Sequence, residues 1–331
     1  NESKLIHIHK HAFASSSVTR ITIPKSVKKI GEKAFFECQQ FTTIEFQENS
    51  ELQIIGNESF SSSALKSIEK IKIPIHVKEI GDRSFYNCKD LTTINFDDGS
   101  ELVKIGYQAL SNTLIEQIAI PAFVDLIDEE CFRNIPTLKE INVSNQNKHY
   151  TYVDNSLLLY KADKSSDQFE ILVFARKDIN KVVIPESIIE ISRYAFEHCD
   201  QLNFLEFSQG IKLNYIHCDV FKDIPINHLV IPMSLSFFRS YLTNPQDMLT
   251  HIAILDEEVN IDKSTYSGFK NHLTISLPYA STVTIEKDCD HFDVITVEKQ
   301  DVEINDVENL SKEHVFRDAP DELLEKNRFP E

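Results

Sequence analysis

Three histidines near the N-terminus are the residues of this chain best suited to metal chemistry. His7, His9 and His11 stand at alternate positions, so they would share one face of a β-strand. Imidazole is a common zinc ligand, but a site needs a complete set of ligands and supporting contacts, and no carboxylate or cysteine is fixed nearby. The alternative, which the sequence favours, is an accidental cluster on an incomplete first repeat. We therefore predict no metal and no cofactor.

The cysteines offer either disulfides or thiol chemistry. Cys38 and Cys88 occupy the same position of a repeated segment two coils apart, about 9.6 Å at ~4.8 Å per coil, whereas a disulfide requires Cα atoms within about 7 Å. No two cysteines form a Cys-x-x-Cys ligand pair. We predict buried free thiols that pack as small hydrophobic groups. The six residues are Cys38, Cys88, Cys131, Cys199, Cys218 and Cys289.

Motifs for catalysis are missing from the sequence. It has no Gly-x-Ser-x-Gly, no His-Glu-x-x-His, no kinase signature and, with only 7 glycines, no loop to hold phosphate. Parallel β-helix enzymes that act on polysaccharides need clustered carboxylates on an exposed sheet, and the exposed strand positions expected here are chemically mixed. We predict no enzyme and no catalytic residues, with a carbohydrate-active β-helix as the least favoured alternative.

A segment that repeats along the chain must set the positions of any functional side chains. Its clearest copies run from Ile21 to Cys38 and from Ile71 to Cys88, and they share the order Ile-Pro, Val, Ile-Gly, Phe, Cys. Two types of repeat alternate, so the full period is a double repeat of about 47 residues. A periodic array of this length predicts one elongated solenoid whose product is an extended surface for binding. We place the starts of eleven repeats of about 23 residues near Val18, Phe41, Ile68, Leu91, Ile115, Leu138, Ile179, Leu202, Ile226, Leu249 and His272.

Alternation within each repeat predicts a strand. Ile44 and Phe46 lie two residues apart and face the interior, while Glu45 faces outward. Proline after the strand stops the ladder, the glycine of Ile-Gly marks a second bend, and the Ala-Phe-x-x-Cys segment predicts a short helix or turn. We therefore expect an α/β repeat solenoid with a parallel sheet on its concave face and short turns or helices on its convex face.

One interval between repeats is much longer than the others. An insertion falls within residues 144–178, where Leu157–Tyr160 and Phe169–Phe174 resemble strands joined by a polar linker. This pattern predicts a β-hairpin that interrupts the solenoid. Two roles stay open for it, a structural spacer or a dedicated recognition element.

Charge is concentrated near the C-terminus. Half of the net charge of −18 comes from residues 286–331, which contain 15 Asp and Glu but only 6 Lys and Arg. We predict a solenoid over residues 1–285, followed by a degenerate cap and an acidic tail over residues 286–331. The negative charge argues against nucleic acid or an anionic membrane as a partner. The sequence has no run of about 18 apolar residues, so we predict no insertion of this chain into a bilayer.

The repeated segment resembles the BspA-type leucine-rich repeat of bacterial and protist surface proteins. The resemblance covers roughly Leu5 to Ile254, extends more weakly to Pro278, and is most literal at Ile21–Ile44 and Ile71–Ile94. It implies a right-handed curved solenoid, a location at the cell surface or outside the cell, and adhesion to host cells, matrix proteins or other microbes. It supplies no catalytic residues. Because no signal or anchor is visible in the chain, an intracellular scaffold is the alternative.

Specificity for a protein partner should reside between the repeated positions, on the exposed side of the strands. Val183, Phe204 and Val230 would form a small apolar patch there, suited to anchoring a partner; the alternative is that the hairpin shields Phe204. The predicted binding residues of the concave face are Arg20, Thr22, Thr43, Glu45, Lys70, Lys72, Thr93, Asn95, Glu140, Asn142, Phe204, Glu206, His228 and His251.

Overall fold

The computed structural model describes most of the chain before residue 232 and short segments after it. The chain divides into two compact units, Asn1–Leu202 with Ile211–Ile224 and Asn203–Gly210 with Pro225–Glu331. Within the described part, no helix has the length and apolarity to cross a membrane. The described residues are 3–41, 43–63, 70–97, 99–128, 130–163, 165–217, 220–221, 224–231, 250–254, 258–261, 273–278, 282–285 and 292–297.

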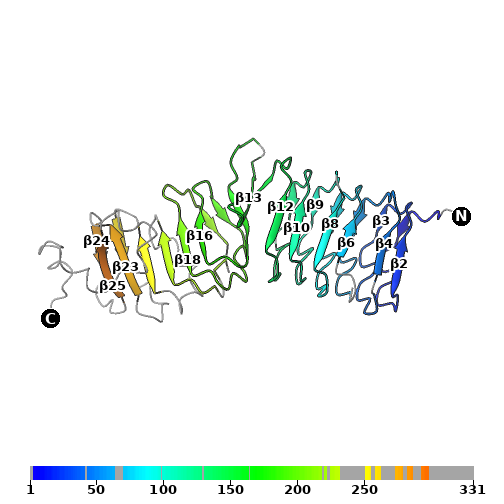
Figure 1. Ribbon diagram of the computed structural model, residues 1–331, viewed down its shortest axis with the longest axis horizontal. Helices are drawn as coiled ribbons and strands as arrows, with labels where there is room; N and C mark the ends of the chain where they lie inside the picture. Colours follow the sequence, from blue (N-terminus) through cyan, green and yellow to red (C-terminus); the bar gives the residue numbers. More distant parts are fainter. Residues whose placement is uncertain are drawn as a thin grey trace, which may run out of the picture. The chain divides into compact units, whose positions relative to one another are not determined.

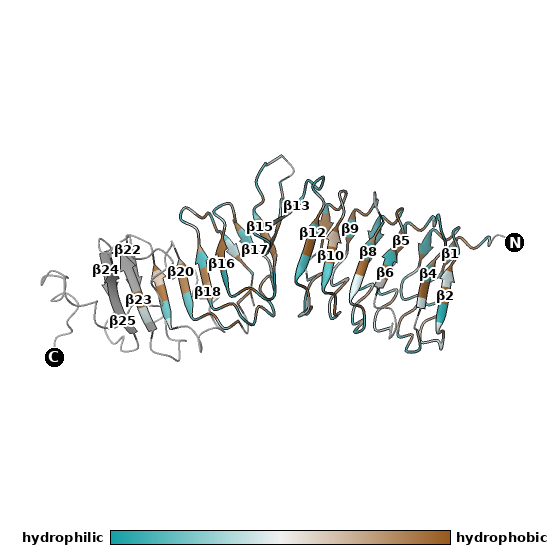
Figure 2. Ribbon diagram, viewed as in Figure 1, coloured by the Kyte–Doolittle hydropathy of each residue, from teal (hydrophilic) through white to brown (hydrophobic). Residues whose placement is uncertain are grey.

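The longer strands of the first unit confirm the predicted parallel sheet. Neighbouring strands pair at equivalent repeat positions, so Thr93 lies opposite Gln117 and Gln117 opposite Glu140. Figure 2 shows the resulting alternation of apolar and polar residues along these strands. Most of their isoleucines point inward and are buried. The longer strands are β2 (Arg20–Ile23), β4 (Thr43–Phe46), β6 (Lys70–Ile73), β8 (Thr93–Phe96), β10 (Gln117–Ile120), β12 (Glu140–Val143) and β16 (Lys181–Ile184).

The strands of the second unit also pair in parallel with one another (Figure 1). A separate two-stranded ladder of this unit pairs Glu258–Ile261 in parallel with Thr282–Ile285. The strands of the unit are β18 (Phe204–Phe207), β20 (His228–Ile231), β21 (His251–Ile254), β22 (Glu258–Ile261), β23 (Leu273–Pro278), β24 (Thr282–Ile285) and β25 (Phe292–Val297). The rest of the predicted cap and acidic tail lies outside the described residues.

The Ile-Gly step forms a second parallel ladder, where the sequence suggested only a bend. A Cβ built on Gly81 would lie 2.7 Å from the backbone nitrogen of Asn57 in the preceding coil, so glycine allows neighbouring coils to approach closely. The outward side of this ladder is the short-strand face. Its strands are β1 (His7–Ile8), β3 (Lys29–Ile30), β5 (Ile54–Ile55), β7 (Glu79–Ile80), β9 (Lys104–Ile105) and β11 (Leu126–Ile127).

The Ala-Phe-x-x-Cys segments are turns, and the helices allowed for the convex face are not found among the described residues. Alternate amides bond to the next coil instead of to their own segment: the N–H groups of Phe35 and Glu37 donate to Ser59 and Ser61 at 2.7 and 3.0 Å. Lys33 and Glu37 hold φ near +55°. Bonding between coils excludes the i to i−4 pattern of an α-helix.

Phenylalanine side chains from successive turns stack along the core. The rings of Phe13, Phe35, Phe60 and Phe85 lie 5.1, 5.2 and 5.3 Å apart between successive centroids and within 5° of parallel. The rings of Phe35, Phe60 and Phe85 are fully buried. This column fills the interior of the coils and holds their turns in register.

The cysteines within the described residues are free and buried, as predicted: Cys38, Cys88, Cys131 and Cys199. The Sγ atom of Cys88 donates to the carbonyl oxygen of Phe60 at 3.1 Å. Burial raises the pKa of Cys199 to about 11, so its thiol is protonated and unreactive at neutral pH. Cys218 and Cys289 lie outside the described residues.

The insertion forms three antiparallel strands, β13 (Tyr150–Val153), β14 (Leu157–Tyr160) and β15 (Ile171–Ala175). We call these strands the hairpin insertion; the two runs singled out in the sequence correspond to β14 and β15. Strand β15 pairs in parallel with the short strand β17 (Glu190–Ile191), which pairs with β19 (Tyr215–Ile216). The hairpin insertion therefore supplies the first strand of a new short-strand ladder.

A buried lysine follows β15 and should limit stability. Lys177 is 5% exposed, and its Nζ atom lies 4.2 Å from the ring centroid of Phe174. Burial lowers the pKa of Lys177, and the aromatic contact offsets only part of that cost. We expect Lys177→Met to raise the free energy of unfolding by about 1 kcal/mol at pH 7, measured by urea unfolding.

The pH dependence checks the cause of this expected gain. Since the pKa of Lys177 is lower in the folded state, the unfolded state binds more protons between the two pKa values, and the wild type gains stability as pH rises through that window. The advantage of Lys177→Met should therefore shrink towards pH 10.5, the ordinary value. The exposed control Lys212→Met should change little; a destabilised Lys177→Met protein at pH 7 would contradict the prediction.

Candidate functional site

The predicted binding residues of the first unit lie mainly exposed on the outward side of the longer strands, which we call the long-strand face. Glu45 and Glu140, its two predicted carboxylates in this unit, lie on non-neighbouring strands and form no acid–base pair. Exposed residues of the predicted set are Arg20, Thr22, Glu45, Lys72, Asn95, Glu140 and Asn142.

Other predicted residues of this face are less accessible. Thr43 is half-buried and Thr93 is buried, because the short side chain of Thr93 is flanked by residues of both neighbouring strands. Lys70 begins β6, and its side chain lies outside the described part. Thr93 is thus a poor candidate for contact with a partner.

Polar groups of the long-strand face bond to one another. The side-chain amide of Asn142 donates to Glu140 at 2.8 Å, and the hydroxyl of Thr22 donates to Glu45 of the next coil at 3.4 Å. Lys72 forms an ion pair with Asp97. The face is therefore polar and mixed in charge.

Three rings form a stack on the long-strand face of the second unit. Phe204, His228 and His251 are register partners on adjacent strands. Ring centroids are 6.3 Å apart for Phe204 and His228 and 4.8 Å apart for the two histidines. Burial lowers the pKa of His251, which favours its neutral form. The proposed apolar patch is corrected here: Val230 is buried, and Phe204 is half-buried in the stack.

The histidines near the N-terminus do not share a strand face. β1 contains only His7 and Ile8, while His11 has a φ of 57° in the following turn. In the part of the chain that the structure describes, no three His, Cys, Asp or Glu side chains come together as metal ligands.

A cavity of about 290 Å³ lies in the first unit where the first short-strand ladder ends. One side is formed by Ile127 and Phe132, and the other by Ile171, Val173 and Glu190. In place of a further strand, the hydroxyl of Tyr150 accepts a hydrogen bond from the backbone N–H of Ile127 at 2.7 Å. The cavity is therefore a consequence of the hairpin insertion.

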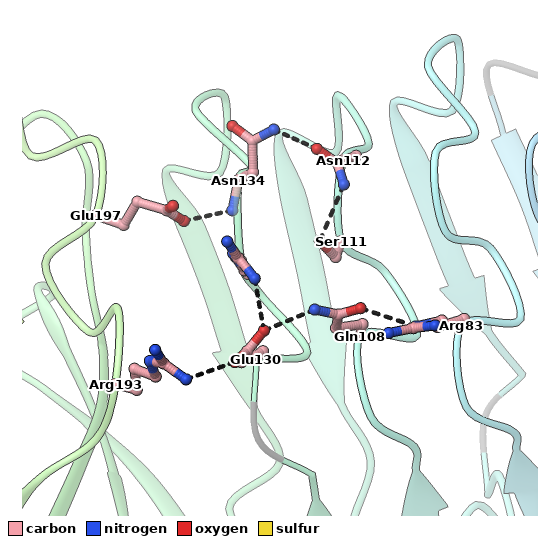
Figure 3. A network of polar contacts seen from close by, with 9 residues as sticks. Arg83, Gln108, Ser111, Asn112, Glu130, Asn134, Arg193 and Glu197 are labelled. Atoms are coloured by element: carbon pink, nitrogen blue, oxygen red, sulfur yellow. Dashed lines mark hydrogen bonds and ion pairs between the residues drawn. The ribbon is translucent and has the colours of Figure 1, made fainter. Parts of the chain in front are cut away.

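Glu130 is the central residue of a network of polar contacts beside the cavity (Figure 3). Its carboxylate accepts hydrogen bonds from Gln108 at 2.6 Å and Arg133 at 2.9 Å, and lies 3.5 Å from Arg193. Burial raises the pKa of Glu130, but the hydrogen bonds from Gln108 and Arg133 outweigh it, so the pKa is lower than usual. Glu130 thus stays ionised and joins the coil before the insertion to the coil after it.

Two further contacts strengthen this connection. The carboxylate of Glu197 accepts a hydrogen bond from the backbone N–H of Asn134 (Figure 3). The guanidinium groups of Arg133 and Arg193 lie 4.5 and 5.0 Å from the ring centroid of Tyr194, within cation–π range. These contacts also join residues from the two sides of the insertion at one edge of the cavity.

Sequence reasoning missed this cavity because its walls come from residues about 40 to 60 positions apart. Two signals pointed to the place. The interval between repeats lengthens there, and the glycine of the Ile-Gly step is replaced by Asp128 and Ser192 on either side of the insertion.

Comparison with protein families identifies the repeats. A model of the BspA type leucine-rich repeat region, present in 6 copies, matches residues 6–69, 65–158 and 168–292. No curated protein gives a significant match. The family match therefore comes from the repeats and covers most of the chain.

Solved structures show the same fold. The pneumococcal vaccine antigen PcpA is 20% identical, with 85% of each chain covered and a TM-score of 0.61. A leucine-rich cell surface protein from Faecalibacterium prausnitzii is 20% identical, with 87% of this chain and 83% of that chain covered and a TM-score of 0.56. A leucine-rich repeat protein from Eubacterium ventriosum is 17% identical, with 85% and 73% covered and a TM-score of 0.56. The parallel coils, the buried repeat residues and the family match agree, and the chain belongs to the BspA-type leucine-rich repeat family.

Proposed function

We propose that this chain is a non-enzymatic protein-interaction module of a surface antigen or adhesin, and that it binds a host, matrix or microbial protein through the long-strand face. The observation that carries the proposal is the in-register parallel ladder, which places outward side chains, most of them polar and exposed, in rows from coil to coil. Solenoids commonly use such extended surfaces to bind proteins. The surface location rests on the family and on the likeness to a cell surface protein and a vaccine antigen.

The buried thiols do not favour an intracellular scaffold over a surface protein. Free cysteines are most informative about redox compartment when they are accessible to oxidants and to other thiols. Here Cys38, Cys88, Cys131 and Cys199 are buried, so they are protected in either compartment. Antibody labelling of intact cells tests the location directly: labelling only after permeabilisation would contradict the surface proposal.

Partner binding can be tested with matched charge variants. Proximity labelling on intact cells would supply a partner, and its affinity would be measured with purified proteins. We expect Glu45→Arg combined with Asn95→Arg and Asn142→Arg to weaken binding at least about tenfold, because three bulky cationic side chains would replace the native contacts and clash with a partner bound along the face.

The control carries the same change in charge at exposed positions outside that face. It combines Glu37→Arg, Gln53→Arg and Gln146→Arg, and it should bind as the wild type does. Equal weakening by both triple variants would indicate a general charge effect. Unchanged binding of the first variant would exclude the long-strand face.

A further inference from the structure

The cavity beside the hairpin insertion has the size and lining of a pocket for one large side chain. Its volume of about 290 Å³ lies near the lower limit of the roughly 300–1,000 Å³ found for small-molecule sites. Ile171 and Val173 line it and are half-buried, and Phe132 is buried. An aromatic or branched aliphatic group would remove this apolar surface from water.

Exposed apolar side chains lie beside the mouth of the cavity. Leu126 is 38% exposed and lines it, and Val103 of the preceding coil is 39% exposed. The two are adjacent, since the backbone N–H of Leu126 donates to the carbonyl oxygen of Val103 at 3.3 Å. These two side chains add exposed apolar surface beside the cavity, as expected at a protein-binding site.

The charges around the cavity favour a cationic residue next to the side chain that a bound partner would insert. Its lining holds three carboxylates and two guanidinium groups, a net charge of −1 with neutral histidine. Glu130 lies between the two arginines. Glu190 instead lies 3.0 Å from the imidazole of His217 and keeps a partly exposed carboxylate. The net charge of the whole chain, −18, has the same sign.

We infer that this cavity is an anchor pocket for a partner polypeptide, which inserts one aromatic or branched aliphatic side chain and places an adjacent lysine or arginine against Glu190. The inference rests on the proposed role in protein binding and adds a second contact area to it, on the short-strand face. Side chains buried in well-packed pockets commonly contribute most of the affinity of an interface. The hairpin insertion would then create specificity by opening the pocket.

Short blocked peptides test the pocket without the natural partner. The probes are N-acetyl-Phe-Lys-amide, N-acetyl-Ala-Lys-amide and N-acetyl-Phe-Glu-amide, observed through methyl NMR of the whole chain. We expect the Phe-Lys probe to shift the methyl signals of Ile171 and Val173. The Ala-Lys probe should bind at least about tenfold more weakly, since it lacks the anchor. The Phe-Glu probe should bind about 1.4- to fivefold more weakly, the range of one exposed ion pair.

Variants assign the binding to the cavity. Val173→Phe should fill it and abolish the shift of the Ile171 methyl signal, whereas the matched control Val183→Phe, on the long-strand face, should retain that shift. Glu190→Gln should remove the preference for Phe-Lys over Phe-Glu. If Val173→Phe fails to fold, Leu126→Ser at the exposed edge should still weaken binding severalfold.

Three results would overturn the inference. They are the absence of methyl shifts with the Phe-Lys probe, equal binding by the Val173→Phe and wild-type proteins, and equal binding of Phe-Lys and Phe-Glu. Failure of the pocket can be told apart from failure of the proposed function: a natural partner that binds wild-type and Val173→Phe proteins equally would leave the function standing without the pocket.

Discussion

Replacing Phe60 by alanine is expected to lower the free energy of unfolding by about 3–5 kcal/mol, the largest stability effect predicted for this chain. The ring of Phe60 is fully buried between Phe35 and Phe85, with centroids 5.2 and 5.3 Å away. Its loss removes apolar burial and leaves a cavity that the rings above and below cannot fill, because each is held by its own coil. Urea unfolding followed by circular dichroism gives the measurement.

The control for this substitution is Phe123→Ala. Phe123 is 62% exposed on the turn after β10, so its removal should change stability by less than about 0.5 kcal/mol. A comparable loss in both variants would show that the stacked column is no more important than a surface ring.

Glu130→Gln is expected to cost about 2 kcal/mol, less than the ~3–5 kcal/mol typical of breaking a fully buried ion pair. The substitution keeps the shape of the side chain but leaves Arg133 and Arg193 without their shared carboxylate and brings two amide N–H groups together at Gln108. The estimate is reduced because the side chains of the two arginines are 39% and 37% exposed, so water can solvate them.

The pH dependence follows from the direction of the Glu130 shift. Its folded pKa lies below the ordinary value of 4.5, so the carboxylate contributes stability that is complete above pH 4.5 and is lost as pH falls through the folded pKa. The difference between wild type and Glu130→Gln should therefore shrink in acid.

An exposed ion pair provides the control for Glu130. Glu32 lies 2.7 Å from Lys10, with both side chains more than 40% exposed, so Glu32→Gln should leave the free energy of unfolding almost unchanged. If Glu130→Gln costs no more than Glu32→Gln, the network does not link the coils on the two sides of the insertion.

The repeat pattern predicted the elements that depend on local spacing. Strands such as β4 and β8 appear where apolar residues alternate, and prolines such as Pro24 follow the strands they end. For the segment after the glycine, the sequence predicts either a short helix or a turn. Local preference did not separate these two, because hydrogen bonds between coils, such as Phe35 to Ser59, decide the outcome.

The predicted binding residues show where periodicity stops being informative. It placed Glu45 and Asn95 outward, and both are exposed, but it placed Thr93 and Val230 outward as well, and both are buried. An outward direction is a property of one strand. Exposure also depends on the side chains of the strands on either side, which periodicity does not describe.

By itself, the sequence determined the family, the parallel coils, the inward residues of the strands and the place of the insertion, because each follows from spacing repeated along the chain. Only the tertiary structure decided that the Ile-Gly steps form a second ladder, that this ladder ends at β11, and that a cavity opens there beside Glu130. The reason is physical: coil stacking repeats a local pattern, whereas the cavity exists where the repeat fails, and its walls are set by contacts such as Glu130 with Arg193 between residues far apart in the chain.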